Sequence, residues 1–124
     1  MLLYKETTDK IIKCFYKVYN ELGHGFLEAI YENSLAILLR EEGLEVEQQK
    51  ELVVKFKNLI VGKYKTDLIV NDKIILELKA AKNIAPEHEA QLLNYLKATN
   101  MGLGLLLNFG NKPEFKRFIF SSNQ

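Results

Sequence analysis

The stretch DLIVNDKIILELK, residues 67–79, decides the fold, because two apolar runs in it flank a polar turn signal. In an extended strand, successive side chains point to opposite faces of the sheet. One face of the second run is therefore apolar, whereas the other carries Glu77 and Lys79. Buried carboxylates are costly unless they are paired or bind a metal. Asp67 and Glu77, two acids in apolar strands, therefore need an explanation.

The length of the turn decides which residues of the two strands face each other. If Val70 pairs with Ile74 around a three-residue loop, Asp67 lies opposite Glu77, and cross-strand partners point the same way. A two-residue turn would instead place Asp67 opposite Leu76, on the apolar face. The sequence favours the three-residue loop, and this register predicts two carboxylates side by side on one sheet face.

The predicted pair of Asp67 and Glu77 is suited to a divalent cation, because two carboxylates at close range repel each other. Oxygen-only ligands select hard ions such as Mg²⁺ or Mn²⁺. Lys79 follows Glu77 on the same face, where it can activate a water or neutralise charge on a phosphate. These parts suit metal-assisted hydrolysis of a phosphodiester. The alternative is a structural Asp–Lys–Glu cluster on a half-exposed sheet face, which so short a motif does not exclude.

The rest of the chain alternates between helical and strand patterns. Apolar residues at helical spacing predict helices over residues 7–22, 26–42 and 85–99. Alternating or short apolar runs predict strands over residues 50–58, 61–70, 73–81, 103–110 and 116–121. The order ααβββαββ predicts an α/β sandwich in which helices cover a small mixed sheet. Its 124 residues predict one domain, residues 1–124.

Composition excludes several classes of protein. Hydrophobic residues at 48% and charged residues at 27% are typical of a soluble globular protein. The longest apolar run is too short to span a bilayer, and charges interrupt the first ten residues where a signal peptide needs an apolar core. One cysteine, Cys14, suits a reducing cytoplasm and packs as a small hydrophobe. The net charge of +1 means that any nucleic-acid site must be local.

Two predicted helices carry further polar candidates. Gln91 and Tyr95 are four residues apart and stack on one helix face, where they can hold a metal-bound water or a phosphate oxygen. The alternative is the polar edge of an amphipathic helix. Glu28 projects beside the apolar stripe of the second helix, from which it can reach the metal site. Alternatively, Glu28 is an acid stabilised at a helix N-terminus.

Lysines are concentrated around the predicted site. Strict alternation places Lys63 and Lys65 on the face of Asp67, flanking the ion, and Lys82 follows the strand that carries Lys79. A polyanion would meet these three lysines on either side of the metal. The alternative is a lysine-rich strand edge that discourages aggregation.

The segment GFLEAIY, residues 25–31, resembles the signature of the GxxExxY protein family, with Gly25, Glu28 and Tyr31 at the three named positions. The later segments TDLIVNDKIILELKAAK, EAQLLNYLKAT and LGLLLNFG are similar to further blocks of that family in order and spacing. The resemblance spans residues 7–120 and implies the PD-(D/E)XK nuclease superfamily. It therefore implies a restriction-endonuclease-like core, in which helices flank a mixed sheet.

The resemblance also implies roles for individual residues. Asp67, Glu77 and the main-chain carbonyl of Leu78 would bind Mg²⁺ or Mn²⁺, and Lys79 would be the catalytic lysine. Glu28 would be the helix-borne acid seen in many members, whereas Gln91 and Tyr95 match the QxxxY motif of the exonuclease-like branches. Thr66 stands where the nominal motif has proline, at a position that varies widely.

Two functions of different classes follow. The first is a cytoplasmic, metal-dependent nuclease acting on nucleic acid, with DNA as the expected substrate and no membrane partner. The second is a catalytically silent nuclease-fold module that binds nucleic acid or assembles with a partner. The complete set of acids, lysine, glutamine and tyrosine favours the enzyme. A chain too short for a substrate-engaging insertion favours partnership or a homo-oligomer.

Overall fold

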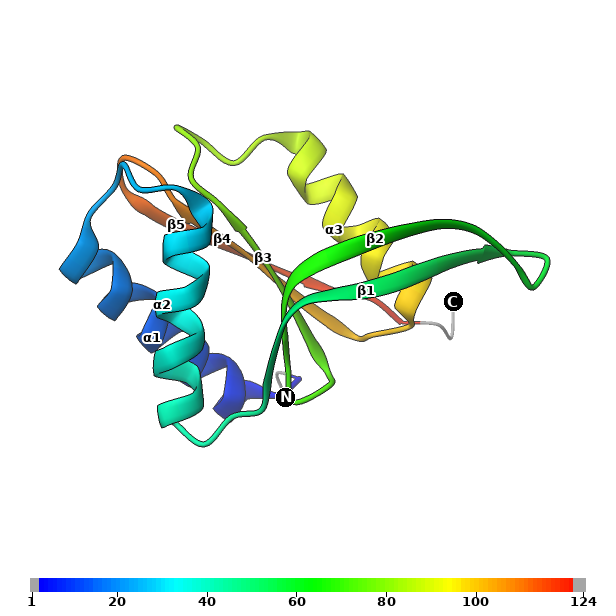
Figure 1. Cartoon of the computed structure of the whole chain (residues 1–124), viewed down its shortest axis with the longest axis horizontal. Helices are drawn as coiled ribbons and strands as arrows, with labels where there is room; N and C mark the ends of the chain where they lie inside the picture. Colours follow the sequence, from blue (N-terminus) through cyan, green and yellow to red (C-terminus); the bar gives the residue numbers. More distant parts are fainter. Residues whose placement is uncertain (1–2, 122–124) are drawn as a thin grey trace.

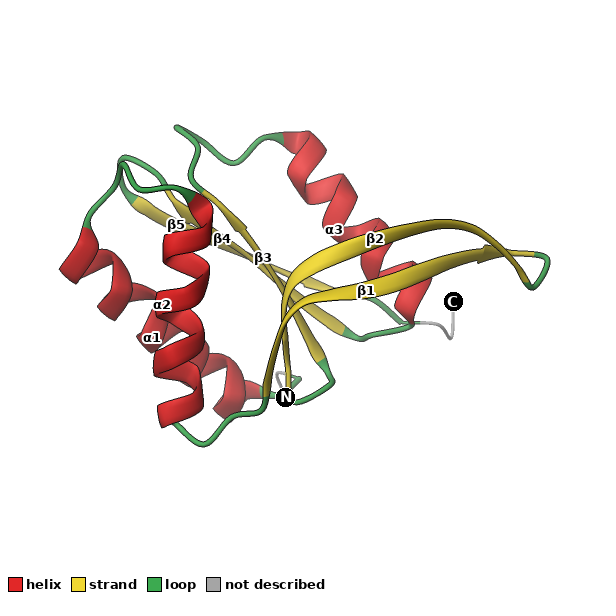
Figure 2. Cartoon of the chain, in the orientation of Figure 1, coloured by secondary structure: helices red, strands yellow, loops and turns green. Residues whose placement is uncertain are grey.

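The computed structural model describes residues 3–121, which form three helices and five strands in the predicted order ααβββαββ (Figures 1 and 2). The helices are α1 (Lys5–Leu22), α2 (Glu28–Glu41) and α3 (Pro86–Thr99). The strands are β1 (Val46–Phe56), β2 (Leu59–Val70), β3 (Ile74–Lys79), β4 (Leu103–Phe109) and β5 (Pro113–Ile119). The predicted α/β fold is confirmed. Of the helices in the described part, none is long and apolar enough to cross a membrane.

The five strands form one mixed sheet in the order β1-β2-β3-β4-β5. Strands β3 and β4 run parallel, and the other neighbours run antiparallel. The parallel pair is joined by α3, because two parallel neighbours need a crossover connection. Strand β1 begins four residues before its predicted start, so the first hairpin is longer than expected.

The helices divide between the two faces of the sheet, with α1 and α2 on one face and α3 on the other (Figure 1). The larger core lies under α1 and α2, and Ile74, Leu76 and Leu78 of β3 point into it, as alternation predicts. Ile75 points to the opposite face, into a smaller core beneath α3. Cys14 is buried in the larger core, and burial raises the pKa of its thiol, which supports the prediction that it packs as a hydrophobe.

The β2–β3 hairpin has the predicted register. Val70 pairs with Ile74 around a three-residue loop, and the antiparallel ladder continues to the pair of Leu68 and Leu76. Asn71 and Asp72 in the loop adopt left-handed backbone conformations, with φ of 53° and 56°. Asparagine and aspartate tolerate this region better than other non-glycine residues, so the turn residues match the loop.

Strand β2 leaves the sheet beyond Leu68. Only its last three residues pair with β3, whereas the preceding residues pair with β1 alone and form a two-stranded ribbon that projects from the sheet (Figure 1). The ribbon also turns along its length. Leu68 points into the core under α1 and α2, but Tyr64, which strict alternation places on the same face, stacks against Tyr95 of α3. Alternation counted along β2 therefore fails between Leu68 and Tyr64.

The connection between α1 and α2 is held by Tyr31, the third position of the GFLEAIY segment. Its hydroxyl donates to the carbonyl of Gly23 at 2.6 Å and accepts from the N–H of Phe26 at 3.2 Å. The Tyr31 ring is fully buried and stacks on Phe109 of β4 at 4.3 Å. Gly25 has a φ of 109°, which favours glycine, so this segment sets how α2 enters its position over the sheet.

Candidate metal centre

The two predicted acids meet where β2 and β3 separate. The Asp67 carboxylate accepts a hydrogen bond of 2.8 Å from the main-chain N–H of Leu78, just beyond the last pair of the β2–β3 ladder. The N–H and C=O of one residue in an extended strand point to the same edge. The carbonyl of Leu78 therefore faces the same gap as Asp67, where no ladder partner from β2 reaches it.

Glu77 lies beside Asp67 and is almost fully buried, with 6% of its surface exposed. Its carboxylate accepts a hydrogen bond of 2.6 Å from the Thr66 hydroxyl. Burial, followed by repulsion from Asp67, raises the pKa of Glu77 to about 8. The Thr66 hydrogen bond and the nearby charge of Lys79 oppose this rise in the pKa but do not cancel it. The two carboxyl groups are thus close enough to share one positive charge.

The donor set of this pair fits a hard divalent cation. Asp67 and Glu77 supply carboxylate oxygens, and Leu78 supplies a main-chain oxygen that faces the same gap; oxygen ligands of this kind suit Mg²⁺ or Mn²⁺. Within residues 3–121, no group of three or more His, Cys, Asp or Glu is arranged to hold a metal. The ion would therefore depend on the two acids, the carbonyl and water.

A third acid, Glu32 of α2, is tied to the pair and was missed by the sequence analysis. Glu32 is buried, and the side-chain amide of Gln49 donates to it at 2.5 Å and to Asp67 at 3.2 Å. Gln48 also donates to Glu32, at 2.9 Å. Neighbouring side chains of a regular strand point to opposite faces, but Gln49 has a φ of 51°, and both glutamines reach the same carboxylate. The backbone of β1 is therefore shaped to connect Glu32 with Asp67.

Glu28, the predicted helix-borne acid, is not at the site. It is exposed in the first turn of α2, and within the described residues no hydrogen bond or ion pair joins it to Asp67 or Glu77. Glu32, one turn further along, is the acid of α2 that is linked to Asp67, through the side-chain amide of Gln49. The signal was present in the sequence, because Glu32 precedes Leu35, Ala36 and Leu39 by three, four and seven residues, the spacing of one buried helix face.

Gln91 and Tyr95 lie together on α3, as predicted, and Tyr95 faces the acids. Its ring stacks on Tyr64 at 3.7 Å, and the Tyr64 hydroxyl donates to the main-chain carbonyl of Tyr95 at 3.4 Å. Burial, followed by the charges of Glu77 and Asp67, raises the pKa of Tyr95, and a side-chain hydrogen bond with Gln91 lowers it. The two tyrosines thus wall the site on the α3 side, and Tyr64 is a further residue that sequence reasoning missed.

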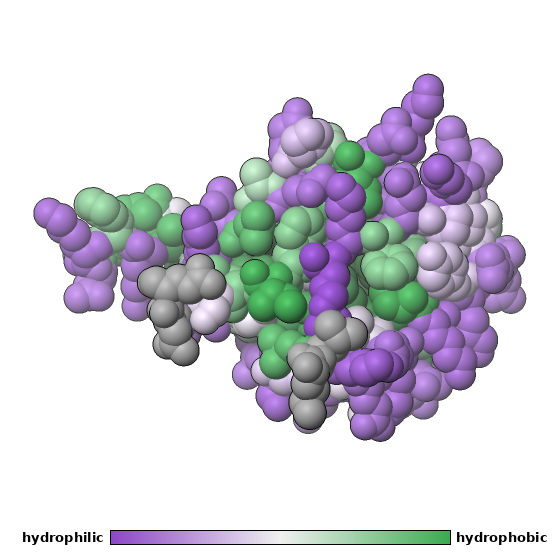
Figure 3. All heavy atoms as spheres, turned by 180° about the vertical axis from the view of Figure 1, so that it is seen from behind, coloured by the Kyte–Doolittle hydropathy of each residue, from purple (hydrophilic) through white to green (hydrophobic). Residues whose placement is uncertain are grey.

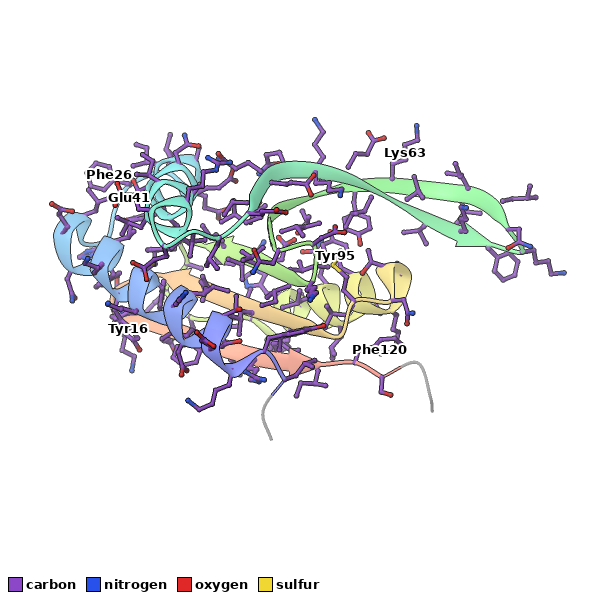
Figure 4. All side chains as sticks on the ribbon, turned by 90° about the horizontal axis from the view of Figure 1, so that it is seen from below. Tyr16, Phe26, Glu41, Lys63, Tyr95 and Phe120 are labelled. Carbon is purple, nitrogen blue, oxygen red and sulfur yellow. The ribbon has the colours of Figure 1, made fainter. Side chains whose placement is uncertain are left out.

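The lysines divide into two groups. Lys79 is half-buried next to Glu77, and Asn108 of β4 fixes the chain just after it through hydrogen bonds of 3.0 Å and 2.9 Å with Ala81. Lys82 is exposed in the following loop. Lys63, in contrast, projects from the side of the ribbon opposite to Tyr95 (Figure 4).

The prediction that Lys63 and Lys65 flank the ion rested on strict alternation, and the turn of β2 breaks that alternation. Lys63 forms a loose ion pair of 3.9 Å with Glu51, and Lys65 is exposed opposite the same residue of β1. The structure therefore does not bring these two lysines beside Asp67 and Glu77. Both lie on the projecting ribbon instead.

Comparison with known proteins assigns the chain to a family. A family model of the PD-(D/E)XK nuclease superfamily matches residues 5–118. That range includes all of the residues assigned above to the candidate site. A search of curated proteins finds no match. The narrower resemblance to the GxxExxY family stays a prediction.

A solved structure has a similar fold. The crystal structure of SSO0001 matches with a TM-score of 0.60 at 19% sequence identity. The match covers 74% of this chain and 50% of SSO0001, so the chain spans about half the length of that protein. At this identity the likeness concerns the fold alone, and it agrees with a restriction-endonuclease-like arrangement of the sheet and helices.

Proposed function

The chain belongs to the PD-(D/E)XK nuclease superfamily, and from this premise we propose that it is a metal-dependent nuclease that hydrolyses phosphodiester bonds of DNA. The observation that carries the proposal is the meeting of Asp67, Glu77 and the main chain of Leu78 at the open edge of β3. Beyond Leu76, β3 is no longer paired with β2, so oxygens on this edge can face an ion. Lys79 lies near Glu77, where its positive charge can stabilise the phosphate of the substrate.

Each residue of the site has a distinct task in this proposal. Asp67, Glu77 and the Leu78 carbonyl would hold Mg²⁺ or Mn²⁺. A bound ion of this kind polarises a phosphoryl oxygen and lowers the pKa of a coordinated water. Lys79 stabilises the negative charge that develops on the phosphate and orients the attacking water.

Other side chains position these groups. The Gln49 amide donates hydrogen bonds to both Asp67 and Glu32, and the Thr66 hydroxyl donates to Glu77. These hydrogen bonds fix the orientation of the Asp67 and Glu77 carboxylates. Gln91 and Tyr95 lie beside the acids on α3 and bind a water or a phosphate oxygen. Lys82, exposed after β3, contacts a neighbouring phosphate.

The direct test is a cleavage assay with purified protein on single-stranded DNA, duplex DNA and RNA. We expect cleavage with Mg²⁺ or Mn²⁺, none with a chelator, and none by Glu77→Gln. Equal cleavage by wild type and Glu77→Gln would indicate a contaminating nuclease. No cleavage of any substrate, at ion concentrations at which calorimetry shows that the site is filled, would contradict an enzymatic role.

The second function is a catalytically silent nuclease-fold module that binds nucleic acid or assembles with itself. The exposed position of Glu28 favours this function, because no hydrogen bond or ion pair in the described residues joins this acid to Asp67 or Glu77. A module of this kind would bind nucleic acid with the same affinity in wild type and Glu77→Gln. Mass measurement in solution would show whether the protein is a homo-oligomer.

A further inference from the structure

The β1–β2 ribbon projects away from the sheet beyond the candidate metal centre (Figures 1 and 3). Residues 52–65, termed the arm below, form its outer part, and β2 in this range pairs with β1 alone. From Thr66 to Leu59 the strand spans about 23 Å at about 3.3 Å per residue. The base of the arm packs on α3 through Leu52 and Tyr64, but the residues near its tip are exposed, so the surface of the tip calls for another explanation.

The arm is positively charged. It contains four lysines and no acidic residue, although the whole chain has a net charge of only +1; the lysines are Lys55, Lys57, Lys63 and Lys65. All four are exposed. Glu51 at the base of the arm lies 3.9 Å from Lys63, and when it is counted with the four lysines of the arm the local net charge is still +3. The arm is therefore a local cationic surface of the kind that meets a polyanion.

The tip of the arm is apolar as well as cationic. Four large apolar residues there are between 57% and 70% exposed, namely Phe56, Leu59, Ile60 and Val61. Figure 3 shows hydrophobic and hydrophilic residues side by side on this projection. Lys57 lies over the ring of Phe56 at 5.8 Å. A group of exposed apolar residues indicates a contact surface, because apolar side chains in contact with water are unfavourable unless a partner covers them.

The arm is continuous with the candidate metal centre. Tyr64 belongs to the arm and stacks on Tyr95, and Asp67 lies three residues further along the same strand. A ligand held along the Tyr64 side of the arm is thus led toward Asp67 and Glu77, whereas Lys63 projects from the opposite side of the ribbon. Strand β2 carries both the arm and Asp67 of the candidate metal centre. We therefore expect the arm to bind the same molecule that the candidate metal centre acts on.

We propose that the arm grips double-stranded DNA beside the scissile phosphate, with its lysines on the phosphates and its apolar tip against base edges in the major groove. The inference rests on the proposed nuclease function and names its substrate as a duplex. The major groove of DNA is about 12 Å wide and admits a two-stranded β-ribbon, whereas that of duplex RNA is deep and narrow. Charge favours DNA over a second copy of the chain, because two arms would bring eight lysines together without an acid.

The first experiment separates phosphate contacts by their dependence on salt. Binding of wild type to a DNA duplex is measured by fluorescence anisotropy in a chelator, so that no cleavage occurs. The double variant Lys55→Gln/Lys57→Gln should lower the slope of log affinity against log salt by about 1.8, or about 0.9 per lost phosphate contact. The matched control Lys13→Gln/Lys17→Gln, on exposed positions of α1, should leave the slope unchanged.

The second experiment tests the apolar tip. Leu59→Thr/Ile60→Thr places β-branched side chains, which favour strands, at both positions and should weaken binding about tenfold at every salt concentration, with the slope unchanged. Wild type should prefer a DNA duplex to an RNA duplex, and the tip variant should lose that preference. Leu27→Thr/Ile37→Thr, at the exposed N-cap of α2 and an exposed position within α2, is the control for general loss of apolar surface.

The outcomes separate the arm from the proposed nuclease activity. If both arm variants bind duplex DNA as wild type does, or if wild type binds no duplex, the inference about the arm fails, whatever the cleavage assay shows. If the arm variants lose binding and wild type cleaves nothing, the arm stands and the nuclease proposal fails. If wild type is a dimer that the tip variant dissociates without losing affinity for DNA, the tip is instead a contact between copies of the chain.

Discussion

The Asp67 carboxylate accepts the main-chain N–H of Leu78 at 2.8 Å, in the position where a strand paired to β3 would offer a carbonyl. Asp67→Asn keeps an oxygen that can accept this bond but removes the charge that repels Glu77. We expect Asp67→Asn and Glu77→Gln to keep the fold, with unchanged or slightly higher thermal stability, and to lose divalent-ion binding in a calorimetric titration.

The control for charge removal is Asp72→Asn, in the exposed loop of the same hairpin, which should bind ions as wild type does. Asp67→Ala should lower the free energy of unfolding by about 1–3 kcal/mol, because the Leu78 N–H then lacks an acceptor. Loss of the fold in both Asp67→Asn and Glu77→Gln would show that the acids serve as structural partners.

The raised pKa of Glu77 predicts how stability depends on pH. Its carboxyl has a pKa of about 8 in the folded chain, against an ordinary value of 4.5, so the folded state holds a proton that the unfolded state releases. This contribution to the free energy of unfolding is fully present below pH 4.5 and is lost as the pH rises through about 8. It amounts to about 5 kcal/mol, and urea denaturation at a series of pH values measures it.

Two comparisons make this pH dependence specific to the site. Glu77→Gln cannot lose a proton and should remove that part of the dependence. Mg²⁺ above pH 8 should restore stability in wild type, because an ion bound to the folded state alone stabilises it. A dependence that is the same in wild type and Glu77→Gln would mean that another group titrates.

Lys79 should affect the rate of cleavage and not the affinity of the site for the metal ion. Lys79→Ala should leave the dissociation constant for Mg²⁺ or Mn²⁺ unchanged and lower kcat by about 100- to 1,000-fold, with little change in KM, as loss of a charge-stabilising group does. Single-turnover kinetics measure the effect. Lys112→Ala, at an exposed position after β4, is the control, and an equal loss in both variants would remove the special role of Lys79.

The hairpin register could be predicted from the sequence, because only one turn length keeps Asp67 off the apolar face. The observed pair of Val70 and Ile74 confirms that argument. The order of the elements could also be predicted, since helical and strand periodicities are distinct in this chain. Both successes rest on local patterns: residues 67–79 contain the whole hairpin, and the buried face of each helix recurs every three to four residues.

The course of β2 beyond Leu68 could not be predicted by counting alternate residues. The ribbon turns where it leaves β3, so Tyr64 faces α3 and Lys63 projects away from Tyr95. The separation of β2 from β3 is a tertiary effect, and no residue type in β2 predicts it. The left-handed Gln49 is equally hidden, because glutamine has no preference for that conformation. The link from Glu32 to Asp67 depends on it.

The last prediction concerns the stability of glycine and alanine variants at Gln49 and at its neighbour Gln48. Glycine should be the more stable replacement at position 49, and alanine at position 48. At position 49, with a φ of 51°, alanine carries the steric cost of the left-handed region but glycine does not, so Gln49→Gly should be about 1 kcal/mol more stable than Gln49→Ala. Both should weaken Mg²⁺ binding about 10- to 100-fold, because Asp67 loses the amide that orients it.

At Gln48, an ordinary strand position, alanine should be the more stable replacement. Urea denaturation of the four variants and an ion titration provide the measurements. If alanine is the more stable replacement at both positions, β1 has a regular backbone at Gln49, and the connection from Glu32 to Asp67 must be abandoned.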